Sequence, residues 1–215
     1  MPPERSEKNK PAEFELLLVS ESPRRRQILS DAGFLFRVDT VKISETIEEN
    51  VNLGAAVVGV ARDKAEAYLA THKHLKGLNI LLLSADTMVF FGEKPLGKPK
   101  NSTEAQEFLR LLSGKTHRVI TGIYIHNLKT GETLGQSDET EVQFRELSEA
   151  EITKYIQSGE PLDKAGAYAI QGEGGQFVTA VKGSRLNVVG FPLELFEKTL
   201  KEKSWYVARE SKNPK

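Results

Sequence analysis

The sequence predicts an α/β protein with a mixed sheet, because strand and helix patterns alternate along its 215 residues. Short apolar runs such as residues 16–19 are typical of buried strands, and longer segments with an apolar residue at every third or fourth position are typical of helices. Hydrophobic residues make up 39% of the chain and charged residues 28%, as in ordinary globular proteins. One domain is predicted, since a single core stops growing only at roughly 250 residues.

The first half of the chain alternates between predicted strands and helices. Ser22 and Pro23 are the residue types of a helix N-cap and first helical position, and Gly33 can end that helix. Asp86 interrupts an otherwise apolar strand, which we expect to end at residues 84–87. The predicted strands span residues 16–20, 35–41 and 80–83, the last continued by residues 88–91 into a turn at 92–95, and the predicted helices span residues 22–33 and 52–72.

The second half contains two helix starts with capping-box spacing. Asn101 precedes Glu104 by three residues, and Ser148 precedes Glu151 in the same way. The remaining predicted elements are a helix after residue 101, a hairpin of residues 116–126 and 132–145 around a turn at 129–131, a helix from 148 that stops at 159–161, a glycine-rich stretch over 166–190, and a final helix opened by Pro192.

Composition excludes several classes of protein. The 30 basic residues balance 30 acidic ones, so no global field attracts nucleic acid or a membrane surface, and any anion site must be local. The absence of cysteine excludes disulfides, thiolate metal sites and a cysteine nucleophile, and the four histidines lack ligand spacing. No apolar run approaches the roughly 18 residues that span a bilayer. We therefore expect a cytoplasmic protein with no nucleic-acid or membrane partner.

The segment from Ser20 to Arg26 joins a predicted strand to a helix N-terminus and carries Arg24, Arg25 and Arg26. Orphan N–H groups and the helix dipole favour an anion at such a position, and guanidinium groups match phosphate oxygens. The alternative is a solvated basic turn. The strand, turn and helix context favours an anion site.

Three further charged residues stand in unusual places. Lys64 continues the apolar stripe of the long helix, so it needs a partner or lies at the rim of the core. Asp86 closes a buried strand, where it can act as general base, bind a metal, or simply cap a turn. Lys98 follows within a dozen residues and either brings a cation to the same place or is an ordinary turn residue.

The glycine-rich segment of residues 162–172 forms the last candidate. Asp163 and Lys164 can pair, and the amide of Gln171 can both donate and accept hydrogen bonds toward a base edge. Its pattern alone is equally that of a structural loop.

Seven segments together resemble the Maf family of nucleotide pyrophosphatases, which hydrolyse nucleoside triphosphates to monophosphate and pyrophosphate. The resemblance covers roughly residues 16–200. It implies an elongated mixed sheet flanked by helices, with two lobes around one deep nucleotide cleft, as in Maf/HAM1-like proteins. A single domain is implied over residues 14–207. The charged, proline-bearing start predicts a flexible tail of residues 1–13, and residues 208–215 are expected to form a C-terminal tail. In chain order the segments read SESPRRRQIL, ARDKAEA, SADTMV, LGKP, LLSGKTHRVITG, EPLDKAGAYAIQG and VVGFPL.

The resemblance also assigns roles. Asp86 matches the proton acceptor of the family, and a divalent cation, Mg²⁺ or Mn²⁺, is expected on Asp86 and Glu45. The segments SPRR, ADT and IQG match the branch of the family that acts on dTTP and UTP, whereas the branch that acts on 7-methyl-GTP has other residues in these segments. Modified pyrimidine nucleotides are a further expected substrate class. The residues that match the phosphate-binding cleft are Ser20, Arg24, Arg25, Lys64 and Lys98, and those that match base selection are Arg24, Thr87 and Gln171.

Three positions depart from the family pattern: Val19, Ala169 and Phe191. The methyl group of Ala169 bears on base selectivity, and no departure affects a charged cleft residue. The alternative function is a nucleotide-binding regulator of cell division or septum formation without essential turnover. The presence of Asp86, Lys64 and Lys98 favours the enzyme. A nucleoside triphosphate is the predicted substrate, and a homodimer is the assembly that the resemblance implies.

Overall fold

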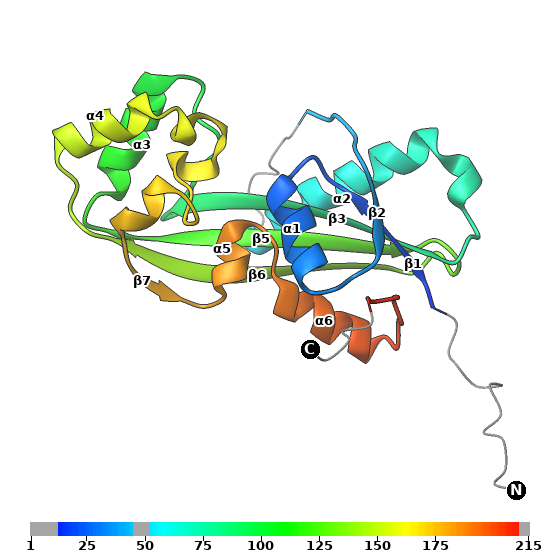
Figure 1. The fold of residues 1–215 in the computed structure, drawn as a ribbon. Helices are drawn as coiled ribbons and strands as arrows, with labels where there is room; N and C mark the ends of the chain where they lie inside the picture. The colour runs from blue at the N-terminus through cyan, green and yellow to red at the C-terminus, as the bar shows by residue number, and fades with distance from the viewer. Residues whose placement is uncertain (1–12, 45–51, 211–215) are drawn as a thin grey trace, which may run out of the picture.

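A mixed seven-stranded sheet runs through the protein, in the order β2-β1-β3-β5-β6-β7 with β4 beside β3 (Figure 1). The computed structural model describes residues 13–44 and 52–210. β1 is parallel to β2 and β3, and the other pairs are antiparallel. The predicted α/β class with a mixed sheet is therefore confirmed. The strands are β1 (Glu15–Val19), β2 (Phe36–Asp39), β3 (Ile80–Phe91), β4 (Lys94–Leu96), β5 (Thr116–Asn127), β6 (Thr133–Phe144) and β7 (Val178–Lys182).

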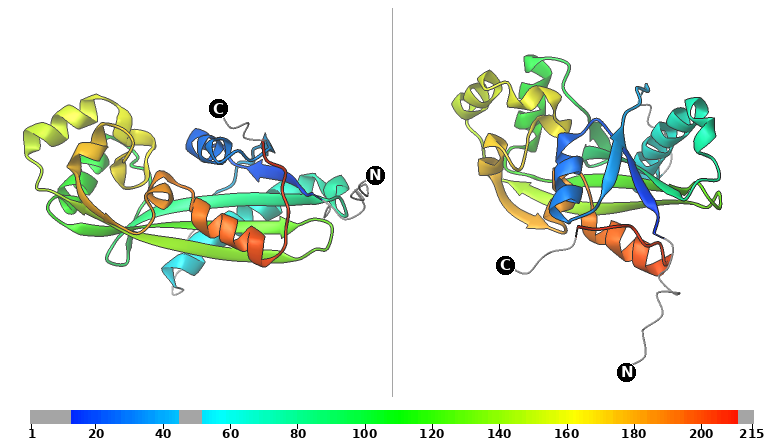
Figure 2. Two further views of the ribbon diagram at one scale, coloured as in Figure 1. Left: turned by 60° about the horizontal axis from the view of Figure 1, so that its bottom comes forward. Right: turned by 45° about the vertical axis from the view of Figure 1, so that its right-hand side comes forward.

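Helices cover both faces of the sheet, because neighbouring residues of its central strands point to opposite sides. On β1, Leu16 and Leu18 pack in one core cluster with α1 and α6, whereas Leu17 and Val19 pack in another with α2. Figure 2 accordingly shows α2 and α6 on opposite sides of the central strands. The α-helices are α1 (Pro23–Asp31), α2 (Leu53–Thr71), α3 (Ser102–Leu112), α4 (Glu149–Gln157), α5 (Arg185–Val189) and α6 (Leu193–Glu202).

Two groups of elements occupy the two ends of the sheet, as the predicted pair of lobes requires. β3, β5 and β6 have 12 residues each and connect the ends. Figure 1 shows α3 and α4 over one end, while α1, β1 and β2 lie toward the other. Of the predicted caps, Ser22 begins α1, Asn101 begins α3, and Ser148 with Glu151 forms a complete capping box on α4.

The third strand differs from its prediction. β3 continues from Ile80 to Phe91 without a break, so Asp86 lies within the strand and does not end it. Pairing with β5 explains the continuity, because Asp86 lies opposite Gly122 and the backbone ladder tolerates a polar side chain at such a position. The strand that ends here is β1, whose last residue, Val19, pairs with Ser84.

One edge of β3 consequently changes neighbours along its length. β1 pairs with it up to Ser84, and β4 pairs with it only from Val89 onward. In the described part of the chain, the edge between these two positions pairs with no strand. The sheet therefore leaves a gap beside Asp86 and Thr87.

The glycine-rich stretch contains short elements that the sequence did not predict. Four 3₁₀ helices occur among the described residues, three of them just before or within this stretch. They are followed by β7 and the single-turn helix α5. The 3₁₀ helices are η1 (Lys73–Leu75), η2 (Glu160–Asp163), η3 (Ala165–Ala167) and η4 (Glu173–Phe177).

The C-terminal segment packs against the domain beyond the predicted boundary at residue 207. The backbone N–H of Glu210 donates to the carbonyl of Gly33 at 2.8 Å. Arg209 lies over the ring of Phe34 at 4.0 Å and pairs with Glu197 at 2.7 Å. Residues 208–210 thus belong to the folded unit. Across residues 13–44 and 52–210, every helix is too short or too polar to span a bilayer.

Candidate active site

A cavity of about 580 Å³ lies beside the gap in the edge of β3. It begins where β1 ends and α1 begins, which is the usual ligand position in α/β sheets. Its other walls come from the segment after β2, the loop after β4, the loop between η2 and η4, and the C-terminal end of α5. The prediction that Asp86 closes a strand is wrong, because β3 continues through this residue. The strand that ends beside the cavity is its neighbour β1.

The cavity is cationic although the chain carries no net charge. Six basic side chains line it, against three carboxylates, so an anion is attracted to this place and not to the surface at large. The basic residues are Arg24, Arg25, Lys42, Lys64, Lys98 and Lys164, and the acidic residues are Glu21, Asp86 and Asp163.

The N-terminus of α1 opens onto this cavity. Ser22 is its N-cap, whose side chain accepts a hydrogen bond from the backbone N–H of Arg25 at 3.4 Å. Ser20 in turn accepts from the backbone N–H of Ser22 at 3.2 Å. Arg24 donates from Nε to the carbonyl of Val189 at 3.2 Å, which ties the α1 start to the end of α5. A basic residue in the first turn opposes the helix dipole, so this arrangement favours an anionic ligand.

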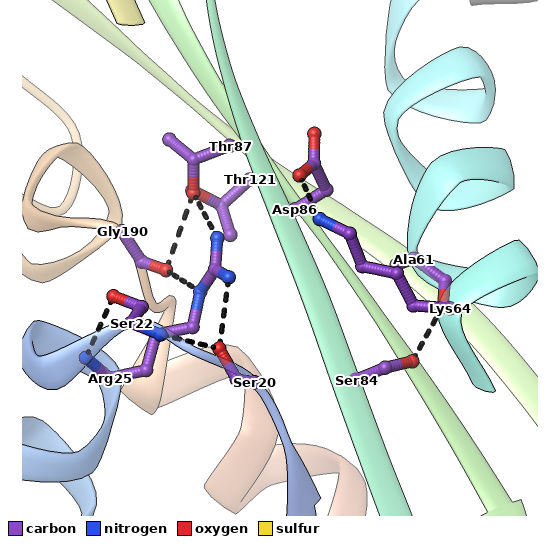
Figure 3. A network of polar contacts seen from close by, with 10 residues as sticks. All are labelled: Ser20, Ser22, Arg25, Ala61, Lys64, Ser84, Asp86, Thr87, Thr121 and Gly190. Carbon is purple, nitrogen blue, oxygen red and sulfur yellow. Dashed lines mark hydrogen bonds and ion pairs between the residues drawn. The ribbon is translucent and has the colours of Figure 1, made fainter. Parts of the chain in front are cut away.

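Arg25 is a buried cation that joins three walls of the cavity (Figure 3). Its Nε donates to the carbonyl of Gly190 at 2.9 Å, its Nη1 to Ser20 Oγ at 3.3 Å, and its Nη2 to Thr87 Oγ1 at 3.0 Å. These contacts fix the guanidinium relative to β1, β3 and the residue after α5. Its role in this structure is to hold the cavity together while placing a positive charge in its wall.

Thr87 is fully engaged in the same network. Its hydroxyl lies 2.9 Å from that of Thr121 and 3.3 Å from the carbonyl of Gly190, in addition to the contact with Arg25. Thr121 donates its own hydroxyl hydrogen to the carbonyl of Asn187 at 3.0 Å, so the single hydrogen of Thr87 serves Thr121 or Gly190 while its oxygen accepts from Arg25. Sequence reasoning missed Thr121, which is completely buried and lies opposite Thr87 in the sheet register. The signal in the sequence is a polar residue within each of two apolar strands, Thr87 in β3 and Thr121 in β5.

Asp86 and Lys64 form an ion pair on the cavity wall, with 2.6 Å between Lys64 Nζ and Asp86 Oδ1. The side chains are 14% and 9% exposed, respectively. Figure 3 shows Lys64 reaching from α2 to β3, and Ser84, two residues before Asp86, donates to the carbonyl of Ala61 on the same helix at 2.7 Å. The prediction that Lys64 faces a partner is confirmed, and the partner here is the candidate catalytic carboxylate.

The loop between η2 and η4 forms the wall opposite α1. Lys164 donates to Asp163, as the sequence predicted. Burial raises the pKa of the Asp163 carboxyl, but the contact with Lys164 and the charge of Arg24 outweigh this effect and leave the pKa below its ordinary value. The backbone N–H of Gly166 donates to the carbonyl of Gly97 at 3.1 Å and so joins this loop to the loop that carries Lys98.

Gln171 lies on a wall shared by two cavities. Together with Arg24 it lines both the main cavity and a neighbouring one of about 460 Å³ beside α1. Both residues therefore stand at the boundary between the cationic cavity and a less charged one.

The structure brings together almost all residues predicted for the site. Glu45 lies outside the described residues, so the structure does not test its placement. Lys42 and Tyr168 were not predicted, although Lys42 follows the end of a parallel strand, where ligand contacts are common. The predicted residues that line the one cavity are Ser20, Arg24, Arg25, Lys64, Asp86, Thr87, Lys98 and Gln171.

The described residues contain no group of three or more histidine, cysteine or carboxylate side chains that could hold a metal ion. This does not conflict with the expected Mg²⁺ or Mn²⁺, because Mg²⁺ is commonly held by one or two carboxylates together with substrate phosphates. Asp86 offers one such carboxylate on the cavity wall. The geometry thus defines an α/β protein whose cavity can hold a polyphosphate beside a carboxylate.

Comparisons with known proteins agree with this class. A family model described as Maf-like protein matches residues 15–203. A protein of Bdellovibrio bacteriovorus named dTTP/UTP pyrophosphatase is 46% identical over 185 residues, which cover 86% of this chain and 96% of that one. Another of the same name, from Desulforamulus reducens, is 39% identical over 178 residues, covering 83% and 91%. On these matches the chain belongs to the Maf-like protein family.

A solved structure of a HAM1 protein from Coxiella burnetii superposes on this chain with a TM-score of 0.46. The two sequences are 15% identical, and the alignment covers 88% of this chain and 99% of that one.

Proposed function

We propose that this protein hydrolyses dTTP and UTP to the monophosphate and pyrophosphate. The observation that carries the proposal is the cavity itself, in which a cationic lining surrounds the Lys64–Asp86 pair in a member of the Maf-like family. The relatives named dTTP/UTP pyrophosphatase support the choice of bases. Modified pyrimidine nucleotides form a further substrate class of the same proposal.

The cations provide the phosphate site. Arg24 stands at the helix N-terminus, Lys98 lies on the facing loop, and Lys42 lies beside the end of β2. Their charges neutralise the triphosphate and stabilise pyrophosphate as it leaves, which is how proteins mainly accelerate phosphoryl transfer. Lys42 extends the predicted set.

We propose that Asp86 acts on the attacking water. In the proposed step, water attacks the α-phosphorus, the bond between that phosphorus and the bridging oxygen breaks, and the electron pair leaves with pyrophosphate. Asp86 orients the water and accepts its proton. Lys64 Nζ, 2.6 Å from Asp86 Oδ1, holds this carboxylate in place on the cavity wall.

A divalent cation fits this site as a substrate-borne ion. We propose that Asp86 supplies one protein ligand to Mg²⁺ or Mn²⁺ and that phosphate oxygens supply others, with Glu45 as a further predicted ligand. Such an ion, when bound, neutralises phosphate charge and lowers the pKa of a bound water.

Base selection falls to the wall around Gln171 and Arg24. The amide of Gln171 can accept from N3–H and donate to a carbonyl of uracil or thymine. The Thr87 hydroxyl is already engaged by Arg25, Thr121 and Gly190. We therefore propose that Thr87 influences base selection by placing these neighbours and not by a direct contact with the base.

Pyrophosphate release from dTTP, UTP, CTP and GTP tests the function, measured with Mg²⁺ and with a chelator. We expect release from dTTP and UTP with Mg²⁺, with dTMP and UMP as the other products. Release of orthophosphate would contradict the proposed bond cleavage. Binding of nucleotides without turnover would favour the alternative, a regulator of cell division or septum formation. A homodimer and a cytoplasmic location remain predictions.

A further inference from the structure

The loop that presents Gln171 is closed at its neck by a carboxylate outside the cavity. Seven residues of the loop 163–171 line the cavity, whereas Glu160 does not line it. Glu160 precedes this loop, and its Oε2 accepts from the backbone N–H of Glu173 at 3.0 Å. Its Oε1 accepts from the backbone N–H of Gly174 at 3.1 Å. One side chain thus joins the start of the loop to its end.

Tyr155 extends this closure to the other side of Gln171. Its hydroxyl donates to Glu160 Oε1 at 2.7 Å and accepts from the backbone N–H of Ala169 at 3.2 Å. The tyrosine is 2% exposed, and its ring packs edge-on against Phe177 with 5.0 Å between the ring centroids. The backbone is therefore held two residues before Gln171 and two residues after it.

The loop backbone lies directly on these two side chains. A Cβ atom on Gly172 would overlap the carboxylate of Glu160, and one on Gly174 would lie 2.6 Å from the hydroxyl oxygen of Tyr155. A side chain at either position is therefore incompatible with Glu160 and Tyr155 in their present places. Such contacts leave the loop little freedom to shift while Glu160 and Tyr155 remain in place.

Glu160 is suited to accept all three hydrogen bonds as a carboxylate. Burial raises the pKa of its carboxyl, but the hydrogen bonds from Tyr155, Gly174 and Glu173 outweigh burial and leave the pKa below its ordinary value of 4.5. An ionised carboxylate has acceptor positions for all of these donors, whereas an amide has only one oxygen.

We propose that Glu160, together with Tyr155, is a positioning residue for nucleotide selection, because it fixes the loop that presents Gln171 to the cavity. Neither side chain lines the cavity, so both act through the loop. This inference rests on the proposed function, since it takes the base to lie against this wall.

Glu160→Gln is the first variant to test. The amide keeps the shape but leaves one backbone N–H without its acceptor, so hydrogen exchange at Glu173 and Gly174 should accelerate by roughly tenfold. KM for dTTP should rise roughly tenfold, with a smaller change in kcat, since a displaced loop weakens base binding more than the chemistry. Discrimination against CTP and GTP should narrow. Tyr155→Phe keeps the buried ring but removes the acceptor of the Ala169 N–H, so exchange at Ala169 should accelerate, and KM and base discrimination should change in the same direction as in Glu160→Gln.

Glu151→Gln is the matched control. Glu151 also accepts several hydrogen bonds, from the Ser148 backbone and side chain, and pairs with Arg145 at 2.8 Å, but it does not line the cavity. The Glu151→Gln variant should have a lower melting temperature than wild type but the same discrimination among bases. If Glu160→Gln did the same, Glu160 would be merely structural and the proposal would be overturned.

Two measurements separate this proposal from the proposed function. If the wild-type protein released no pyrophosphate, the pyrophosphatase assignment would be wrong. Amide exchange and dTTP affinity from calorimetry need no turnover, so they would still decide about Glu160. The positioning role of Glu160 would be overturned if amide exchange were unchanged in Glu160→Gln and Tyr155→Phe. It would also be overturned if amide exchange were faster but the affinity for dTTP were unchanged.

Discussion

At the scale of single residues, the cavity depends on opposite charges that stabilise one another. Lys64 and Asp86 lie 2.6 Å apart with little exposure to solvent, where an isolated charge would be costly. The pair places a carboxylate and an ammonium side by side on the wall of a cationic cavity. We therefore expect Lys64 and Asp86 to act as a unit.

A double-mutant cycle tests that unit. We expect Lys64→Ala and Asp86→Asn each to lower kcat/KM for dTTP by about 100-fold or more, because each removes a charged group from the reacting centre. The double variant should be little worse than Asp86→Asn, since residues that act together are not additive. Lys182→Ala, which breaks the exposed pair with Glu141, is the control and should leave kcat/KM unchanged. Additive losses would show that the two residues act separately.

Polar residues in unlikely places were the ones that sequence could predict. Lys64 stood on an apolar helix stripe and Asp86 in an apolar strand, so each required an explanation. Glu160 and Tyr155 carried no such mark, because a glutamate after a turn and a tyrosine on a helix are ordinary. Their role arises from contacts between segments far apart in the loop, which no local pattern encodes.

At the scale of elements, the position of α2 on the sheet decides where Lys64 lies. β5 presents Gly122 to the helix, opposite Asp86 in the register. A Cβ there would lie 2.6 Å from the backbone nitrogen of Val58, so the helix backbone rests on the bare strand. This close approach lets Lys64 reach Asp86.

Gly122→Ala should therefore separate α2 from β5. We expect a loss of about 1 to 3 kcal/mol in unfolding free energy, the usual effect of overpacking, together with a fall in kcat/KM as Lys64 moves away from Asp86. Gly59→Ala is the control, because its Cβ would meet nothing within 4 Å and alanine should favour the helix by roughly 0.5 to 1 kcal/mol. Urea unfolding measures the unfolding free energies of the two variants. A Gly122→Ala variant as stable as wild type would contradict the packing argument.

Elements with a clear period were predicted well, and elements defined by pairing were not. Ser22 and Ser148 mark helix starts in the sequence, and both caps exist. β3 was predicted to break at Asp86, but its ladder with β5 carries it through, since strand continuity depends on the neighbour. α5 and β7 are five residues each in a glycine-rich stretch, too short to display a period.

At the scale of the whole molecule, an aromatic cluster connects the long hairpin to the cavity. His117 on β5 is 2% exposed and lies 2.8 Å from the hydroxyl of Tyr168, which belongs to the cavity loop. Both rings contact Phe144 edge-on. His117 therefore packs against Tyr168, a residue of the cavity wall.

Folding stability should for this reason depend on the charge of His117. Burial lowers the pKa of its imidazole from 6.5 to about 4, and His117 Nδ1 has no hydrogen-bond partner among the described residues that a second N–H could use. Between these two values the unfolded chain binds one more proton at this residue than the folded chain does. The stabilisation by His117 is thus complete above pH 6.5 and is lost as the pH falls toward 4, by about 1.4 kcal/mol per pH unit.

Urea unfolding of wild type and His117→Gln between about pH 5 and pH 7.5 measures this contribution. All other titrating groups are common to the two proteins, so the difference between their slopes isolates His117. The variant should be less stable at neutral pH, because glutamine does not fill the same space, but its stability should fall less steeply below pH 6.5. Parallel curves would mean that His117 titrates alike in the folded and unfolded chains, which would contradict the lowering of its pKa by burial.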